Sequence, residues 1–245
     1  MLSSVIIVVV TLIVKCLCLP LEDFYPFGSR KGDKSVSHIV GYSKVILSED
    51  LIFFNQLHRE LIVNNNGVIS FERPFNVIKP LKFPANNSLI AALWTDPNAK
   101  RTGRVFYRYS TDRVLLDRAS KEIQNVYSMP FSPTSMFITS WNVADNANQR
   151  SLRGTALMSN PFQLVIVQDK HHYQCYMLFL YGDNLKIIQS RVSDVIVTAG
   201  YDADNGQNFA NIPGSWTMEI NGLNETSNVG VPGMWIFNCD AYSEE

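Results

Sequence analysis

The strongest constraint on the fold is a run of asparagines followed by glycine, at residues 64–67, that separates two apolar segments. A tight hairpin of the type I′ class requires positive φ at both central residues, which Asn tolerates and Gly adopts freely. The flanking segments have the β-branched and aromatic bias of strands. The sequence therefore predicts a β-hairpin with Asn66 and Gly67 as its structural turn, joining strands over 60–64 and 68–71.

Further strand-like runs recur along the chain, and Gly and Pro residues are scattered between them as turn punctuation, with no internal repeat or linker. The sequence therefore predicts one mainly β domain. The runs lie at 88–94, 103–110, 135–143, 162–169, 174–182 and 234–239.

One segment departs from the strand pattern, because its apolar residues repeat at helical spacing from 113 to 127. Thr111 or Asp112 can cap its start. On its outer face, opposite charges lie four positions apart and can form ion pairs: Asp117 with Lys121, and Arg118 with Glu122. We expect one amphipathic helix, about 113–127, packed on antiparallel sheet in a single globular extracellular domain.

The N-terminal residues have the pattern of a signal peptide: a polar start, an apolar stretch and small residues before a cleavage point. The stretch is about half the roughly 20 residues of a membrane-spanning helix. We predict a signal over 1–18, a mature chain from 19 without a transmembrane anchor, and secretion. The last residues, 241–245, are predicted to form a polar tail.

Two cysteines, Cys175 and Cys239, remain after the predicted signal is removed. An oxidising lumen favours a disulfide between them, and the alternative is two buried free thiols. Asn86 and Asn224 each begin an Asn-X-Ser/Thr tripeptide, the acceptor pattern for glycosylation. The expected product is a secreted glycoprotein with one disulfide.

Seven stretches, in this order, resemble the nidogen-like extracellular (NIDO) domain family, most closely its alpha-tectorin type and the sushi, nidogen and EGF-like domain-containing type. The resemblance covers 19–240, with a family core at about 88–240. It implies a secreted matrix or cell-matrix adhesion module that binds extracellular matrix or cell-surface proteins. The stretches are "FYPFG", "LIVNNNGVISF", "IAALWTDPN", "VYSMPFSPTSMFITSWNV", "NPFQLVI", "NIPGS" and "TSNVGVPGMWIF".

Two positions depart from the family pattern: Asn98 replaces the second acidic residue of "W-x-D-x-D", and Asn142 stands where members often have Asp. The resemblance therefore gives no firm metal site. Asp202 and Asp204 are weak candidates for a calcium cage, although an EF-hand loop starting there fails at its sixth and twelfth positions. The simpler interpretation is a polar Asx turn.

The sequence offers little for catalysis or nucleic-acid binding. Lys and Arg number 21 against 22 Asp and Glu, so no basic excess is available for phosphates. There is no G-x-S-x-G elbow, "GSRKGDKS" fails as a phosphate loop, and the adjacent His171 and His172 lack metal spacing. We expect a non-catalytic binding protein without catalytic residues or cofactors.

Two alternatives stay open: a secreted carbohydrate- or calcium-dependent binder, and an enzyme with an unrecognised site. Four tryptophans could form a sugar platform, although those within apolar runs suit the core and only Trp216 is expected to be exposed. The tripeptide Lys-Gly-Asp at 31–33 matches integrin-binding motifs, but turn geometry is the favoured interpretation.

Overall fold

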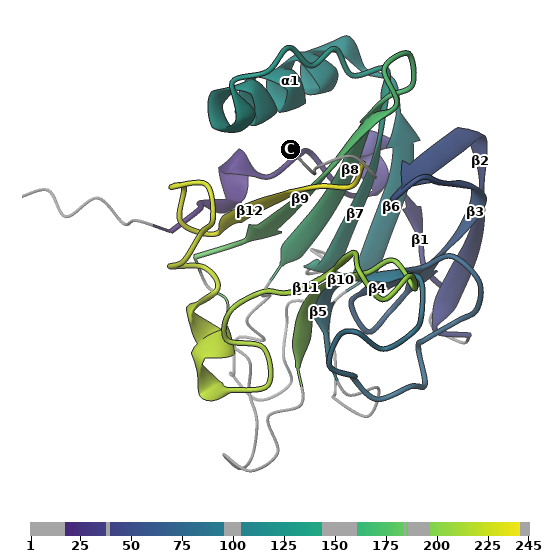
Figure 1. Ribbon diagram of the computed structural model, residues 1–245, viewed down its shortest axis with the longest axis vertical. Coiled ribbons are helices and arrows are strands. Elements are labelled where there is room, and N and C mark those ends of the chain that lie inside the picture. The colour runs from purple at the N-terminus through teal and green to yellow at the C-terminus, as the bar shows by residue number, and fades with distance from the viewer. Residues whose placement is uncertain are drawn as a thin grey trace, which may run out of the picture.

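The structure, a computed structural model, describes residues 18–37, 40–95, 104–143, 161–183, 185 and 197–240. Apart from Cys18, the predicted signal lies outside the described residues, as does the predicted tail at 241–245. Two six-stranded antiparallel sheets pack face to face, with one α-helix on the outside (Figure 1). The fold is thus mostly β in a single domain, as predicted.

Sheet I carries the helix on its outer face. Its strand order is β1 (Lys34–Ser35), β6 (Arg104–Ser110), β7 (Ser135–Val143), β8 (Phe162–Asp169), β9 (Gln174–Tyr181) and β12 (Met234–Asn238).

Sheet II faces it with the order β11 (Phe209–Asn211), β10 (Thr198–Asp202), β5 (Leu89–Trp94), β4 (Val68–Ser70), β3 (Gln56–Asn64) and β2 (Tyr42–Phe53). Three short 3-10 helices complete the described elements: η1 (Leu21–Asp23), η2 (Ser29–Lys31) and η4 (Met218–Gly222).

The main core fills the space between the sheets, because alternate strand residues point to opposite faces. In β8, Leu164 and Ile166 face this core, whereas Val165 and Val167 face outward beneath the helix. A strand that is buried on both faces has apolar residues at nearly every position. The sequence of β8 is such a run, so this strand could be predicted from sequence.

The helix α1 (Arg113–Tyr127) begins and ends where the sequence predicts. The Asp112 side chain caps it by accepting hydrogen bonds from the backbone N–H groups of Val114 and Leu115. Leu116, Ala119 and Ile123 form its buried stripe. The helix therefore covers the outer face of sheet I, as Figure 1 shows.

The predicted hairpin joins β3 to β4, but its turn differs from the prediction. Ile62 pairs with Ser70 and Val63 with Ile69, which leaves a longer connection than a two-residue turn. Only Gly67 has positive φ, at 94°, and Asn66 does not, so type I′ is wrong. A Cβ at Gly67 would lie 2.1 Å from the Leu93 carbonyl oxygen, so glycine is required by packing as well as by φ.

The disulfide joins Cys175 to Cys239, with Cα atoms 5.0 Å apart, so the pairing expected from sequence is present. It ties β9 to the segment after β12. The backbone N–H of Phe54, just after β2, donates to the Cys239 carbonyl at 2.7 Å. The disulfide region therefore connects the two sheets at one end.

Candidate functional site

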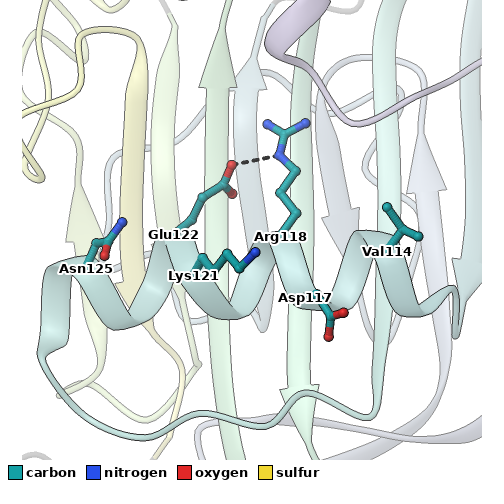
Figure 2. Close-up of a pocket in the computed structure, with 6 residues that line it drawn as sticks. All are labelled: Val114, Asp117, Arg118, Lys121, Glu122 and Asn125. Atoms are coloured by element: carbon teal, nitrogen blue, oxygen red, sulfur yellow. Dashed lines mark hydrogen bonds and ion pairs between the residues drawn. The ribbon is translucent and has the colours of Figure 1, made fainter.

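An open groove follows the exposed flank of α1 and encloses about 480 Å³. Its lining side chains come from positions three or four apart, which lie side by side on a helix surface. Figure 2 shows Arg118 and Glu122 pointing toward the N-terminal segment, while Asp117 points away from it. The lining residues are Val114, Asp117, Arg118, Lys121, Glu122 and Asn125.

The two inward-pointing residues of the groove hold the N-terminal segment, residues 19–33. Arg118 Nε donates to Glu122 at 2.7 Å, and the guanidinium lies 4.2 Å from the centre of the Tyr25 ring. Its terminal nitrogens donate to the carbonyls of Asp23 and Phe24. The second predicted helix pair, Asp117 with Lys121, forms no ion pair in the described part of the chain.

Tyr25 is fixed at both ends of the residue. Its hydroxyl donates to Glu122 at 2.7 Å, and burial, reinforced by the nearby Glu122 carboxylate, raises the pKa of this hydroxyl well above its usual value. Its backbone N–H and carbonyl both bond to the buried Gln163 amide, at 2.9 Å each. These groups are therefore engaged in the contacts that hold the N-terminal segment in place.

The Lys-Gly-Asp tripeptide is not displayed for a partner. Asp33 forms an ion pair with Arg108, and its side chain is 2% exposed. The backbone N–H of Gly28 also donates to Asp33 at 2.6 Å. Because the carboxylate is buried and paired, the integrin-type interpretation does not hold for the folded protein.

The weak calcium candidates form the Asx turn that was their simpler interpretation. Asp202 is buried and accepts hydrogen bonds from the backbone N–H groups of Ala85 and Asp204, the latter at 2.9 Å. Asp204 lies in an exposed turn at positive φ. Among the described residues, no three His, Cys, Asp or Glu side chains are grouped as metal ligands.

The described histidines also serve local structure. His171 and His172 lie in the turn between β8 and β9, where His172 Nδ1 is 2.6 Å from the buried Asp169 carboxylate. His58 stacks on Phe71 with ring centres 4.1 Å apart, and burial lowers the pKa of His58. None of the three lines the groove on α1.

The tryptophans do not assemble a sugar platform. Trp94, Trp141 and Trp235 are buried, and Trp141 Nε1 donates to the Asn64 carbonyl at 2.8 Å, which joins the two sheets. Trp216 is the least buried of the four, as expected, but its Nε1 is bonded to Thr198 at 3.0 Å. One partly exposed ring is a poor basis for carbohydrate stacking.

Near the disulfide, Asp240 accepts a hydrogen bond from the backbone N–H of Cys175. Burial raises the pKa of this carboxyl to about 6. No local pattern in the sequence indicates this residue, because its environment is created by β9 lying beside the C-terminal segment. Asp240 is not among the residues that line the groove.

Comparison with known families places the fold. The model of the nidogen-like domain matches residues 59–241, which is well over half of the 245 residues. The chain belongs to the nidogen-like domain family. The match includes the hairpin at residues 64–67, all of α1 and strands of both sheets.

Relatives of this nidogen-like domain include alpha-tectorin and nidogens. Mouse alpha-tectorin is 32% identical over 237 residues, covering 90% of this chain and 10% of that protein. Nidogen of Drosophila melanogaster is 25% identical over 210 residues, covering 81% of this chain and 15% of that protein. Mouse nidogen-1 is 25% identical over 239 residues, covering 90% of this chain and 19% of that protein.

The chain therefore spans less than a fifth of these relatives. No solved structure matches it significantly. Alpha-tectorin and the nidogens are secreted proteins of the extracellular matrix, and the nidogen-like domain described here is extracellular with them. Within the described residues, no helix has the length and apolar character to cross a membrane.

Proposed function

We propose that the protein acts in the extracellular matrix by binding another protein through the surface of its nidogen-like domain, without catalysis. The observation that carries this proposal is the state of the groove on α1. Its two inward residues, Arg118 and Glu122, are bonded to each other and to the N-terminal segment. The exposed side chains of Val114, Asp117 and Lys121 are therefore what the groove offers a ligand.

The outward side of α1 is suited to a protein partner. Val114 is a 76% exposed aliphatic side chain on an otherwise polar helix face. Asp117 and Lys121, about one and two turns further along, are exposed charges of opposite sign. An apolar contact beside charges of both signs is the composition of a protein interface with a polar rim.

A retention experiment on matrix extract tests this surface. Immobilised secreted protein is incubated with extracellular matrix extract, and the retained proteins are quantified. The double variant Val114→Glu, Lys121→Glu reverses the local charge and removes the apolar contact. We expect it to retain at least tenfold less of the protein that the wild type retains, as loss of a central interface contact does.

The matched control is Val77→Glu, because Val77 is 75% exposed in the segment that covers sheet II. The Val77→Glu variant adds a negative charge away from α1. It should retain as much matrix protein as the wild type does. Equal retention by all three proteins would place the binding surface elsewhere. A wild-type protein that retains no matrix protein would contradict the binding function itself.

The alternative of a calcium-dependent binder has its own test. A ligand that binds the native state raises stability with the logarithm of its concentration. Titrating Ca²⁺ from a chelated start should leave the melting temperature unchanged, because the carboxylate of Asp202 is bonded to backbone N–H groups. A rise that saturates with Ca²⁺ would support the calcium-dependent alternative.

A further inference from the structure

The two Asn-X-Ser/Thr tripeptides of the chain occupy opposite environments. Residues 86–88 lie in a turn before β5, where Asn86 is exposed and has a φ of 53°. In the described part of the chain, the Asn86 side chain makes no hydrogen bond. Asn224 is 6% exposed, and its Nδ2 donates to the Asp183 carbonyl at 3.2 Å.

The hydroxyl groups at the third positions differ in the same way. Thr226 Oγ1 donates to the Gly222 carbonyl at 2.8 Å, at the end of η4. Ser88 Oγ is buried and has no hydrogen-bond partner in the described structure. The Ser88 hydroxyl therefore adds no hydrogen bond to the folded state.

Both observations point to modification of the first tripeptide. N-glycosylation acts on Asn-X-Ser/Thr in chains that enter the secretory route, and the third hydroxyl belongs to the acceptor pattern. We propose that Asn86 carries an N-linked oligosaccharide, and that Asn224 stays unmodified in the folded, secreted protein. The Ser88 hydroxyl then serves recognition of the chain before it folds.

The covalent step uses a lipid-diphosphate-linked oligosaccharide as the donor. Nδ2 of Asn86 bonds to the anomeric carbon of the sugar, while the bond from that carbon to the diphosphate oxygen breaks. The lipid diphosphate leaves with the bonding electron pair, and the amide nitrogen loses one proton. The side-chain amide of Asn86 thus becomes a secondary amide, and its exposed position lets the chain fold with the oligosaccharide attached.

The turn is held so that Asn86 alone remains available. The backbone N–H of Ala85 donates to Asp202, and the Asn87 side chain accepts a hydrogen bond from Arg73 at 2.7 Å. A glycan at Asn86 would stand over the outer side of sheet II, opposite the face that carries α1. At Asn224 a glycan would displace the bond to Asp183 and could not fit a buried side chain.

This inference rests on the extracellular location and not on the proposed binding function. The experiment is expression of the full chain in a secreting animal cell, followed by treatment of the secreted protein with peptide N-glycosidase and by mass spectrometry of its glycopeptides. Ser88→Ala and Thr226→Ala each remove one acceptor hydroxyl. Ser88→Thr and Thr226→Ser keep the acceptor pattern and are the matched controls.

Glycosidase treatment should increase the electrophoretic mobility of four secreted proteins by the same amount. These are the wild type, Thr226→Ala and the two controls, Ser88→Thr and Thr226→Ser. Untreated Ser88→Ala should already have the electrophoretic mobility of the deglycosylated wild type. It should also be as stable as the deglycosylated wild type, since the Ser88 hydroxyl has no hydrogen-bond partner in the described structure. If Thr226→Ala is not secreted, the wild-type glycopeptide map decides alone. A glycopeptide containing Asn224, an unmodified Asn86, or an unchanged shift in Ser88→Ala would overturn the proposal.

Discussion

The outer faces of the two sheets are covered in different ways. Sheet I is covered by α1, which needs only an apolar stripe because its backbone groups bond to one another. Sheet II is covered by an irregular segment, residues 71–88, which has no such internal ladder. Buried backbone groups must find partners, so the sheet itself has to supply them to this segment.

The asparagines of the hairpin supply those partners. Asn64 Oδ1 accepts a hydrogen bond from the Phe75 N–H at 2.7 Å, and Asn66 Nδ2 donates to the Phe75 carbonyl at 2.8 Å. Trp94 Nε1 donates to the Ile78 carbonyl at 3.1 Å. The comparison shows that an irregular cover depends on specific side chains, whereas a helical cover depends on a pattern.

The largest expected effect comes from Gly67→Ala, next to the irregular cover. Its Cβ would overlap the Leu93 carbonyl oxygen at 2.1 Å, so β5 would have to shift. We expect a loss of more than about 4 kcal/mol in unfolding free energy, measured by urea denaturation, or failure of secretion. The control Gly206→Ala has similar positive φ but open space around it, and should cost only about 1 kcal/mol.

The second effect tests whether the two halves unfold as one unit. Replacing both Cys175 and Cys239 by Ser opens a loop with a sequence separation of 64, for which the chain-entropy model gives about 4 kcal/mol. Because the Phe54 N–H bonds to the Cys239 carbonyl, we expect a single transition at lower urea concentration. Two separate transitions would show that sheets I and II unfold independently.

The third prediction contrasts the covers directly. Asn64→Ala leaves the Phe75 N–H and other buried groups without partners, and should cost about 3 kcal/mol. Hydrogen exchange should rise most at Phe75 while the amides of α1 stay protected. Uniform loss of protection over both sheets would contradict a local role for Asn64.

The helix side should respond less to loss of its polar cap. Asp112→Ala removes the acceptor for the Val114 and Leu115 N–H groups, which remain accessible to water. We expect a cost of about 1 kcal/mol, measured by thermal unfolding, with Asp112→Ser close to wild type. A cost as large as that of Asn64→Ala would remove the distinction between the two covers.

The smallest effect concerns pH. The folded state raises the pKa of Asp240 from 3.8 to about 6, so it holds the proton more tightly than the unfolded chain does. This contribution is present below the unfolded pKa and is lost as pH rises through about 6. Partial exposure keeps it below about 1 kcal/mol. Asp240→Asn should flatten the pH dependence of the melting temperature between pH 4 and about 7.

The contrast between the covers also decides what the sequence could predict. The limits of α1 and of seven strands lie within one residue of the predicted limits, because the helix has clear periodicity and the strands are distinct apolar runs. The strand β2 was missed because a register shift between Ile46 and Leu51 interrupts its alternation. The strand β10 was missed because Gly200 breaks its pattern, although a Cβ there would meet the Ala210 carbonyl.

The candidate site was less accessible to prediction. The disulfide followed from compartment and cysteine number, without geometry. The bonds that fix the N-terminal segment join residues 138 positions apart, as Gln163 and Tyr25 do, and no local pattern encodes such a pairing. The opposite environments of Asn86 and Asn224 depend in the same way on packing that only the folded chain creates.

The disulfide also fixes how the domain would carry mechanical load. Tension applied to the chain on both sides of the domain reaches Cys175 from one side and Cys239 from the other, and the covalent bond joins these two points directly. The chain between them, including most of β9 and all of β12, lies outside the load path. Under stretching, the bonds of the N-terminal segment and of the strands before β9 would yield first, while the chain between the two cysteines, which includes β10 and β11 of sheet II, is shielded from the load.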